Sequence, residues 1–293
     1  MRVEATVQTV AFCKNMEKIY SVADGIITVH DTTDFYPKHV LECGQIFRYE
    51  KFGENYKVIS NNRLCTLIKD GDCVIIKCSD TDYFINFFDL DRDYYNLREK
   101  ISKLGYEKEV NYGRGLRILK QEPFEMLISF IISANNHIPR IRSTIEKLCR
   151  RYGENCGDYY AFPTAEALTN ATVEELRSIG LGYRAEYVLD TAKAVYNGAL
   201  VGLENLSDDQ LRRSLIAFKG VGGKVADCIM LFGYSRYGRF PVDTWVVKAY
   251  GRKKSEAKSL ERELTEKYGD LSGFVQQYVF YYKRNNPDII KIT

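Results

Sequence analysis

Residues 207–245 read SDDQLRRSLIAFKGVGGKVADCIMLFGYSRYGRFPVDTW, and this stretch decides the fold of the second half of the chain. Ser207 and Gln210 have the spacing of a capping box, after which leucines recur at helical spacing. A Gly-Val-Gly-Gly run interrupts that pattern, and a second helix is predicted from near Lys224 to around Gly233. The stretch therefore predicts two helices joined by a tight glycine-rich turn.

The turn has the composition of an anion site. Gly220 and Gly222 lack side chains, so backbone N–H groups can approach a phosphate at the positive end of the second helix. Lys224 lies in the first turn of that helix, where the helix dipole and partial burial both disfavour the ammonium form. We expect its pKa to fall from about 10.4 to about 8, at a cost of about 3 kcal/mol, which makes a neutral amine available as a nucleophile.

Two further side chains accompany this lysine. Cys228 follows one helical turn later, on the same face of the helix. Asp243 comes just after a proline, near the predicted N-terminus of another helix, from where it can return toward the hairpin. An amine, a carboxylate and a phosphate clamp this close in sequence indicate chemistry on nucleic acid.

The segment F-K-G-V-G-G-K-V-A-D-C, followed by P-V-D, resembles the helix-hairpin-helix motif of a DNA glycosylase superfamily. Its K-V-A-D-C form is similar to that of 8-oxoguanine DNA glycosylases. The resemblance implies that Lys224 attacks C1' of the damaged nucleotide and that Asp243 stabilises positive charge on the sugar. It also places Cys228 against the flipped base. Taken alone, the hairpin is also compatible with a non-catalytic DNA-binding motif, and Cys228 with a core thiol.

Length and composition set limits on the class of protein. The 293 residues suffice for two or three modest domains, and the net charge of +3 is too small to prove a nucleic-acid partner. The first thirty residues lack the pattern of a signal peptide and no apolar run spans a membrane, so we expect an intracellular protein. The eight cysteines form no C-x-x-C pair and none follows Cys228. A disulfide framework, a zinc site and a four-cysteine iron-sulfur cluster are therefore not expected. No redox or organic cofactor is required, and the sequence does not establish whether the hairpin binds a monovalent cation.

The first third of the chain reads mainly as strands. Short β-favouring runs separated by turn residues occupy 47–51, 56–60, 64–69 and 73–78 and predict an antiparallel meander. Helices predicted from about Tyr83 and over Tyr94 to Leu104 would cover one side of it. The fold class is therefore α+β, with an N-terminal antiparallel β-sheet domain at 1–110. An all-α glycosylase region at 111–293, in two helical subdomains, would carry the helix-hairpin-helix at 208–233.

Within the sheet domain, C-G-Q-I-F-R at 43–48 resembles the family's G-Q-x-F-R. In the family, this glycine's carbonyl accepts a hydrogen bond from N7–H of 8-oxoguanine, a donor that guanine lacks. Leaving a buried carbonyl against the lone pair of unoxidised N7 would cost about 1–3 kcal/mol. Gly44 has the simpler alternative of a strand bulge.

From about residue 110 the apolar residues recur at helical spacing. Pro123 opens a helix that is apolar nearly all round, and we expect it at the centre of the second domain. The N-N-H-I-P-R that follows resembles the family's N-N-x-I-x-R, with His137 where a third asparagine is usual. The resemblance implies that Asn135 fills the gap left by the extruded base and that Arg140 reads the orphaned cytosine.

Two later segments complete the resemblance. G-Y-R-A at 182–185 implies that Tyr183 wedges between base steps and that Arg184 is a second cytosine reader. Gln276 and Phe280, at i and i+4 on the last helix, match a glutamine for the Watson–Crick edge of the base and a ring for its face. Without the resemblance, a surface Tyr-Arg pair and a core phenylalanine would explain these residues.

The matches run in order through most of the chain and identify it as a member of the 8-oxoguanine DNA glycosylases. The family implies a monomer that flips 8-oxoguanine, preferably opposite cytosine, out of double-stranded DNA, excises it, and nicks the strand by β-elimination through a lysine Schiff base. The chain departs from the family at one position near the aspartate. Some members have a histidine two residues after it, whereas this chain has Trp245. A glycosylase for another lesion and a non-enzymatic DNA-binding protein remain as alternatives. Basic clusters at 140–151 and 248–254 are compatible with DNA contacts or with solvated helix faces.

Overall fold

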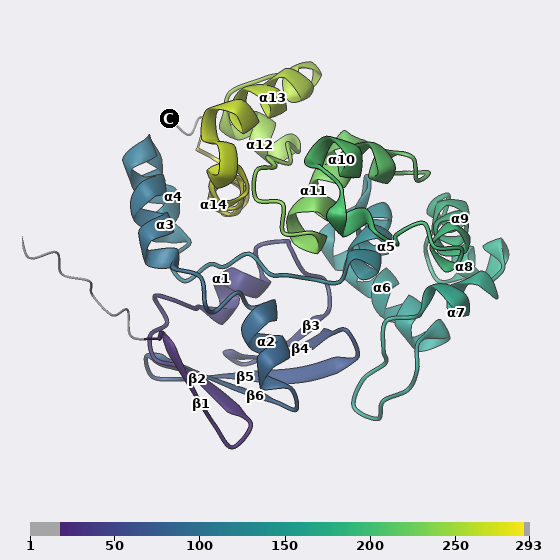
Figure 1. Cartoon of the computed structure of the whole chain (residues 1–293), viewed down its shortest axis with the longest axis horizontal. Coiled ribbons are helices and arrows are strands. Elements are labelled where there is room, and N and C mark those ends of the chain that lie inside the picture. The colour runs from purple at the N-terminus through teal and green to yellow at the C-terminus, as the bar shows by residue number, and fades with distance from the viewer. Residues whose placement is uncertain (1–17, 290–293) are drawn as a thin grey trace, which may run out of the picture.

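The computed structural model describes residues 18–289. It consists of one antiparallel sheet followed by a larger helical region (Figure 1), which confirms the predicted α+β class. The sheet has the order β1-β2-β6-β5-β4-β3. Its strands are β1 Tyr20–Ala23, β2 Ile26–Val29, β3 Tyr49–Phe52, β4 Asn55–Ser60, β5 Arg63–Asp70 and β6 Cys73–Cys78. The α-helices are α1 Pro37–Leu41, α2 Thr81–Phe87, α3 Tyr94–Ile101, α4 Glu107–Tyr112, α5 Pro123–Ser133, α6 Ile138–Tyr152, α7 Ala165–Thr169, α8 Val173–Ser178, α9 Arg184–Tyr196, α10 Asp208–Ile216, α11 Gly223–Gly233, α12 Thr244–Ala249, α13 Ala257–Tyr268 and α14 Ser272–Asn285.

The meander from β3 to β6 is confirmed, with strand ends within two residues of those predicted. The hairpin of β1 and β2 was missed, although its turn has a recognisable sequence. Asp24 and Gly25 form a two-residue turn in which both residues have positive φ, 50° and 72°. Asp-Gly favours such hairpin turns because both residues tolerate the left-handed conformation.

The prediction for the helix at 94–104 was partly wrong. Helix α2 packs on the sheet through Phe84 and Phe87, as expected. Tyr94 and Ile101 of α3 instead join the helical core, and α3 and α4 stand beside α14 in Figure 1. The Tyr106 hydroxyl lies 2.8 Å from that of Tyr250 and so fixes this stretch to the C-terminal helices. The helical core thus draws in residues before the proposed domain boundary at 110.

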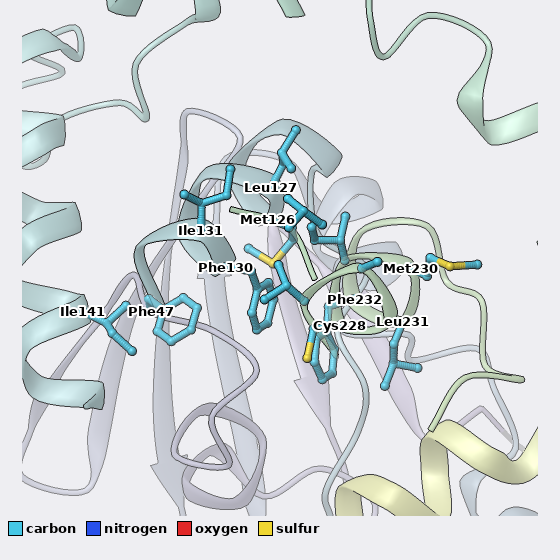
Figure 2. Packing of buried hydrophobic residues seen from close by; sticks show 14 of the residues in the cluster. Phe47, Met126, Leu127, Phe130, Ile131, Ile141, Cys228, Met230, Leu231 and Phe232 are labelled. Carbon is cyan, nitrogen blue, oxygen red and sulfur yellow. The ribbon is translucent and has the colours of Figure 1, made fainter. Parts of the chain in front are cut away.

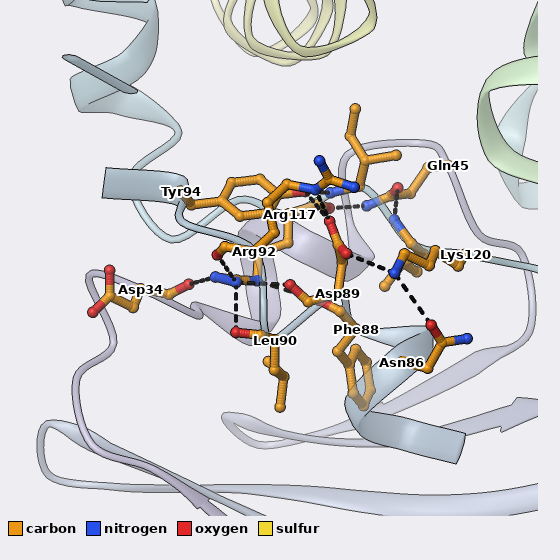
Figure 3. Close-up of polar contacts among 12 residues, drawn as sticks. Asp34, Gln45, Asn86, Phe88, Asp89, Leu90, Arg92, Tyr94, Arg117 and Lys120 are labelled. Atoms are coloured by element: carbon orange, nitrogen blue, oxygen red, sulfur yellow. Dashed lines mark hydrogen bonds and ion pairs between the residues drawn. The ribbon is translucent and has the colours of Figure 1, made fainter. Parts of the chain in front are cut away.

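The extended linker before α5 joins the two cores through Arg117, whose side chain is 1% exposed. Its guanidinium donates to the carbonyls of Phe88, Asp34, Asp89, Leu90 and Arg92 (Figure 3). Gln45 bonds the same linker: its amide donates to Arg117 O at 2.7 Å and accepts from Leu119 N at 2.9 Å. Burial without these partners would be costly for either group. Together they hold the segment around Gly44 against the linker.

Helix α5 lies at the centre of the helical core, as its sequence predicts. Eight consecutive residues, Glu125 to Ile132, are buried. Figure 2 shows Phe130 of α5 beside Cys228 and Phe232 of α11, and the rings of Phe130 and Phe232 stack at 5.8 Å. Core packing thereby holds α11 in a fixed position. Among the helices of the described part of the chain, none is long and apolar enough to cross a bilayer.

Candidate active site

The predicted helical hairpin is formed by α10 and α11. The capping box of Ser207 and Gln210 is present, and residues 217–222 make the turn. Gly220 has φ +83°, and a Cβ there would lie 2.7 Å from the ring of Tyr187. Only glycine fits this position without strain. Gly222 is the N-cap of α11, and a Cβ on it would meet nothing within 4 Å, so the N-terminus of α11 faces open space.

Lys224 is the second residue of α11, and its ammonium lies 5.5 Å from the centre of the Phe130 ring. Lys224 as a whole residue is exposed to solvent, but its ammonium group is surrounded by protein, and burial has the largest single effect on its pKa. Burial lowers the pKa of Lys224, but Cys228 and Asp243 raise it by more, so the pKa lies above its ordinary value. The expected fall of this pKa was wrong, because the sequence does not show how strongly the partners offset burial and the dipole. Lys224 is an ammonium ion in the free protein at neutral pH.

Cys228 lies beside this ammonium. Its side chain is 4% exposed, and burial raises the pKa of the thiol to about 11 against the opposing attraction of Lys224. The group is therefore a neutral thiol at neutral pH. The thiol and the Phe130 ring, which lie side by side in Figure 2, together form an apolar surface next to the Lys224 amine.

Asp243 is the N-cap of α12, as its sequence position predicts. Its Oδ1 accepts hydrogen bonds from the backbone N–H groups of Trp245 and Val246, both at 2.9 Å. Burial raises the pKa of Asp243, partly opposed by these two donors, by Lys224 and by Arg284. The cap fixes one carboxylate oxygen on the helix and leaves the carboxylate within the electrostatic reach of Lys224.

Gly44 and Phe280 meet, although 236 positions separate them in sequence. A Cβ on Gly44 would lie 3.1 Å from Cε1 of Phe280 and 3.1 Å from Nη1 of Arg284. Gly44 has φ +87° and lies in a bend between α1 and β3, so the alternative of a strand bulge was wrong. Gln276 of α14 is 5% exposed, and its Oε1 has no hydrogen-bond partner among residues 18–289. This corner therefore combines an aromatic ring with an unsatisfied buried acceptor.

A second group of predicted residues gathers at the end of α5. Asn135 has φ +52°, just after the helix, where asparagine tolerates the left-handed conformation. The Arg184 guanidinium donates to the carbonyls of Ala134 and Asn135 and lies 4.4 Å from the ring centre of Tyr183. Tyr183 is 53% exposed, whereas Arg184 is 6% exposed. Arg184 thus holds the Asn135 turn in the free protein, and only Tyr183 projects outward.

Comparisons with known proteins agree on one family. Residues 27–127 match the 8-oxoguanine DNA glycosylase, N-terminal domain, and residues 128–270 match the HhH-GPD superfamily base excision DNA repair protein. An N-glycosylase/DNA lyase of Saccharomyces cerevisiae is 33% identical over 276 residues, covering 80% of this chain and 72% of the yeast protein. The chain belongs to the 8-oxoguanine DNA glycosylase family.

Further relatives support this assignment. A probable N-glycosylase/DNA lyase of Methanothermobacter thermautotrophicus is 30% identical over 228 residues, covering 68% of this chain and 72% of that protein. A crystal structure of the Clostridium acetobutylicum 8-oxoguanine glycosylase/lyase, in complex with double-stranded DNA containing cytosine opposite 8-oxoguanine, superposes with a TM-score of 0.84. It is 37% identical and covers 92% of this chain and 98% of its own. The protein is accordingly a DNA N-glycosylase and an abasic-site lyase.

Sequence reasoning missed several residues that shape the site of this glycosylase. Arg284 lies beside Gly44. Asp227, which is 1% exposed, accepts hydrogen bonds from Nε and Nη2 of Arg212 at 2.8 and 3.2 Å across the hairpin. Spacing on α14 places Arg284 on the face of Phe280 and is the one signal that could have identified it. The Arg212–Asp227 pair has no local signal because the partners lie on different helices.

Several arginines of the two basic clusters of this glycosylase are engaged within the chain. Arg142 donates to the carbonyls of Phe47 and Tyr49, and ion pairs join Arg150 to Glu146 and Arg151 to Glu175. Arg252 is similarly paired with Glu256 and Glu263. A cavity of about 790 Å³ lies between the sheet and α6, lined by Arg48 and Arg142 but not by Lys224. Within residues 18–289, no group of three His, Cys, Asp or Glu side chains is placed to hold a metal ion.

Proposed function

We propose that this glycosylase excises 8-oxoguanine from double-stranded DNA and nicks the resulting abasic strand through a Schiff base on Lys224. The observation that carries the proposal is the position of Lys224 at the N-terminus of α11, beside Cys228 and within the field of Asp243. The similarity to N-glycosylase/DNA lyases and to the Clostridium acetobutylicum enzyme supports the substrate.

The proposed steps use groups that the site provides. The Lys224 amine bonds to C1' as the C1'–N9 bond breaks, and that electron pair leaves with the base. Asp243 stabilises the positive charge that develops on the sugar. Because the pKa of Lys224 is raised in the free protein, its nitrogen must lose a proton in order to bond to C1'. The base gains an electron pair as the C1'–N9 bond breaks, and it accepts this proton as it departs. Opening of the sugar ring at the C1'–O4' bond then gives the Schiff base, which makes the C2' proton acidic. Loss of that proton breaks the C3'–O bond and expels the 3'-phosphate.

The base pocket is proposed from Gly44, Cys228, Gln276 and Phe280. Among residues 18–289, no hydrogen bond reaches the Gly44 carbonyl, and Oε1 of Gln276 is unpartnered. Both acceptors are therefore free to accept from a ligand that donates, and the buried one on Gln276 is unfavourable to leave unpaired. N7–H of 8-oxoguanine is such a donor, whereas the unprotonated N7 of guanine would face the Gly44 carbonyl with a lone pair.

The DNA contacts are proposed from the face around Asn135. Tyr183 would wedge into the stack, Asn135 would fill the gap, and Gly220 and Gly222 would direct backbone N–H groups to a phosphate. Arg140 lies in the first turn of α6 and is exposed, which suits a reader of the opposite cytosine. Arg184 would contact that cytosine with its remaining Nη1, or act by holding Asn135.

Borohydride trapping tests the proposal, on a duplex with one 8-oxoguanine opposite cytosine. We expect a covalent adduct with the unmodified protein and with Lys219→Gln, and none with Lys224→Gln. Lys219 is the matched control because it lies in the same hairpin, where it is paired with Asp190 at 2.6 Å. Release of alkylated or mismatched bases with 8-oxoguanine untouched would indicate another lesion. Duplex binding without any base release would indicate a binding protein.

The preference for cytosine has its own test. Single-turnover excision of 8-oxoguanine should be fastest opposite cytosine, and Arg140→Ala should reduce that preference by roughly 10- to 100-fold, the usual effect of one base contact. Equal rates opposite all four bases with the unmodified protein would contradict the proposed roles of Arg140 and Arg184.

A further inference from the structure

Arg284 lies on the same face of α14 as the two residues proposed to hold the base. Gln276, Phe280 and Arg284 follow one another at intervals of four, which places them on one side of a helix. The guanidinium lies 5.4 Å from the centre of the Phe280 ring. The side chain is half-buried, so most of its length is packed and only part of it reaches solvent.

The two ends of the guanidinium differ in their partners. Nη2 donates to the carbonyl of Glu42. Nη1 is buried and has no hydrogen-bond partner within the described residues 18–289. A Cβ on Gly44 would lie 3.1 Å from this Nη1, so the unpartnered N–H groups lie next to the segment whose carbonyl is proposed to read N7–H.

The charge of Arg284 also reaches the catalytic groups. Burial raises the pKa of Asp243 and that of the Cys43 thiol, and the charge of Arg284 opposes part of each rise. A buried, charged donor without an acceptor is unfavourable in the free protein. A ligand that brings an acceptor to Nη1 would relieve that cost on binding.

We infer that Arg284 is a further base-binding residue, which donates Nη1–H to a carbonyl oxygen of the flipped oxopurine beside Gly44. This inference rests on the proposed function. In 8-oxoguanine the N7–H group lies between two carbonyl oxygens, O6 and O8, so a donor adjacent to the Gly44 carbonyl meets one of them. Arg284 thus completes a donor-acceptor pair along this edge of the base: Gly44 accepts and Arg284 donates.

The contact contributes more to the reaction than to binding. When the C1'–N9 bond breaks, its electron pair passes to N9 and is delocalised onto the carbonyl oxygens of the base. A guanidinium hydrogen-bonded to one of these oxygens therefore becomes more strongly bound as the bond breaks. Cleavage at a preformed abasic site involves no base, so the contact of Arg284 with the base plays no part in that reaction.

Three variants test the inference under single-turnover conditions, each on two duplexes that carry 8-oxoguanine or a preformed abasic site opposite cytosine. Arg284→Met keeps the length of the side chain and removes charge and donors, whereas Arg284→Lys keeps the charge. We expect Arg284→Met to excise 8-oxoguanine roughly 10- to 100-fold more slowly than the unmodified protein. The same variant should nick the abasic site within about twofold of the unmodified rate. Arg284→Lys should recover part of the lost excision rate.

Gln277→Leu is the matched control for an anchoring role. Gln277 also joins α14 to the Gly44 segment, through a 3.1 Å bond to the Cys43 carbonyl, but it carries no charge. Equal losses in Gln277→Leu and Arg284→Met, without rescue by lysine, would mean that Arg284 only holds the loop. An undiminished rate in Arg284→Met would also overturn the inference. Failure of the unmodified protein to excise 8-oxoguanine would instead contradict the proposed function.

Discussion

At the scale of the residue, the protonation of Lys224 depends on its neighbours. Burial lowers the pKa of Lys224, and Cys228 raises it, through the charge of the thiolate that forms near pH 11 and through a hydrogen bond. Replacing Cys228 by alanine removes the raising contribution, so the pKa of Lys224 should fall. We expect the pH at which half of the protein is trapped on an abasic duplex to shift to lower values.

The control for this prediction is Cys149→Ala. Cys149 is another buried thiol, and the charges that affect it are those of Arg48, Glu125 and Glu146. This variant should leave the trapping profile unchanged. A profile that moves to higher pH in Cys228→Ala would contradict the sign of the interaction.

Glu125 in α5 gives a second prediction at this scale. Burial raises the pKa of Glu125 from 4.5 to about 7, although the charge of Arg48 lowers it in part. The folded state therefore holds this proton more tightly than the unfolded state, and the free energy of unfolding falls as pH rises from about 4.5 to about 7. Glu125→Gln should remove this loss of stability. At pH 8 the free energy of unfolding of the variant should exceed that of the unmodified protein by at most about 3 kcal/mol.

Urea unfolding at pH 5 and pH 8 measures the effect of Glu125→Gln. The variant should gain stability relative to the unmodified protein at pH 8 and little at pH 5. The same difference at both values would show that Glu125 does not titrate in this range.

At the scale of the element, the hairpin depends on the backbone of Gly220. Gly220→Ala forces a side chain into φ +83° and against Tyr187, which should destabilise the protein by about 1–3 kcal/mol. Gly222→Ser is the control, because Gly222 has φ −90°, is an N-cap and has open space around it. Thermal unfolding of both variants compares them, and equal losses would show that the turn tolerates Gly220→Ala.

Elements whose signals are local could be predicted from the sequence, and those fixed by distant partners could not. The hairpin, the cap at Asp243 and the β3–β6 meander follow from capping residues, glycines and turn pairs. The packing of α3 against the C-terminal helices depends on hydroxyl and ring contacts of Tyr106 with Tyr250 and Tyr268. These partners lie more than 140 positions away, and no periodicity within 94–104 indicates them.

The same limit applies to the candidate site. The i, i+4 spacing alone predicts that Cys228 neighbours Lys224 and that Gln276 shares a face with Phe280. Whether the pKa of Lys224 rises or falls depends on the balance of burial, Cys228 and Asp243. That balance is set by tertiary packing, so the sequence could indicate which residues meet but not the direction in which the pKa of Lys224 shifts.

At the scale of the whole molecule, the two cores are joined by the buried guanidinium of Arg117. Arg117→Met would leave five backbone carbonyls without this donor, and we expect a loss of about 3–5 kcal/mol in the free energy of unfolding. Arg114→Met, in the same linker but exposed, should change stability by less than about 0.5 kcal/mol. Urea unfolding of both variants provides the comparison, and similar values would contradict the role of Arg117.

The segment around Gly44 takes part in both cores, since Cys43 and Phe47 pack in the helical core and Ile46 packs in the sheet core. The hairpin with Lys224 belongs to the helical core alone. If the proposed function holds, loosening of the contact between the cores would therefore separate the proposed base pocket from the proposed nucleophile. Such a molecule would retain the chemistry of strand cleavage and lose its discrimination, so the fidelity of repair would decline before its capacity to cut.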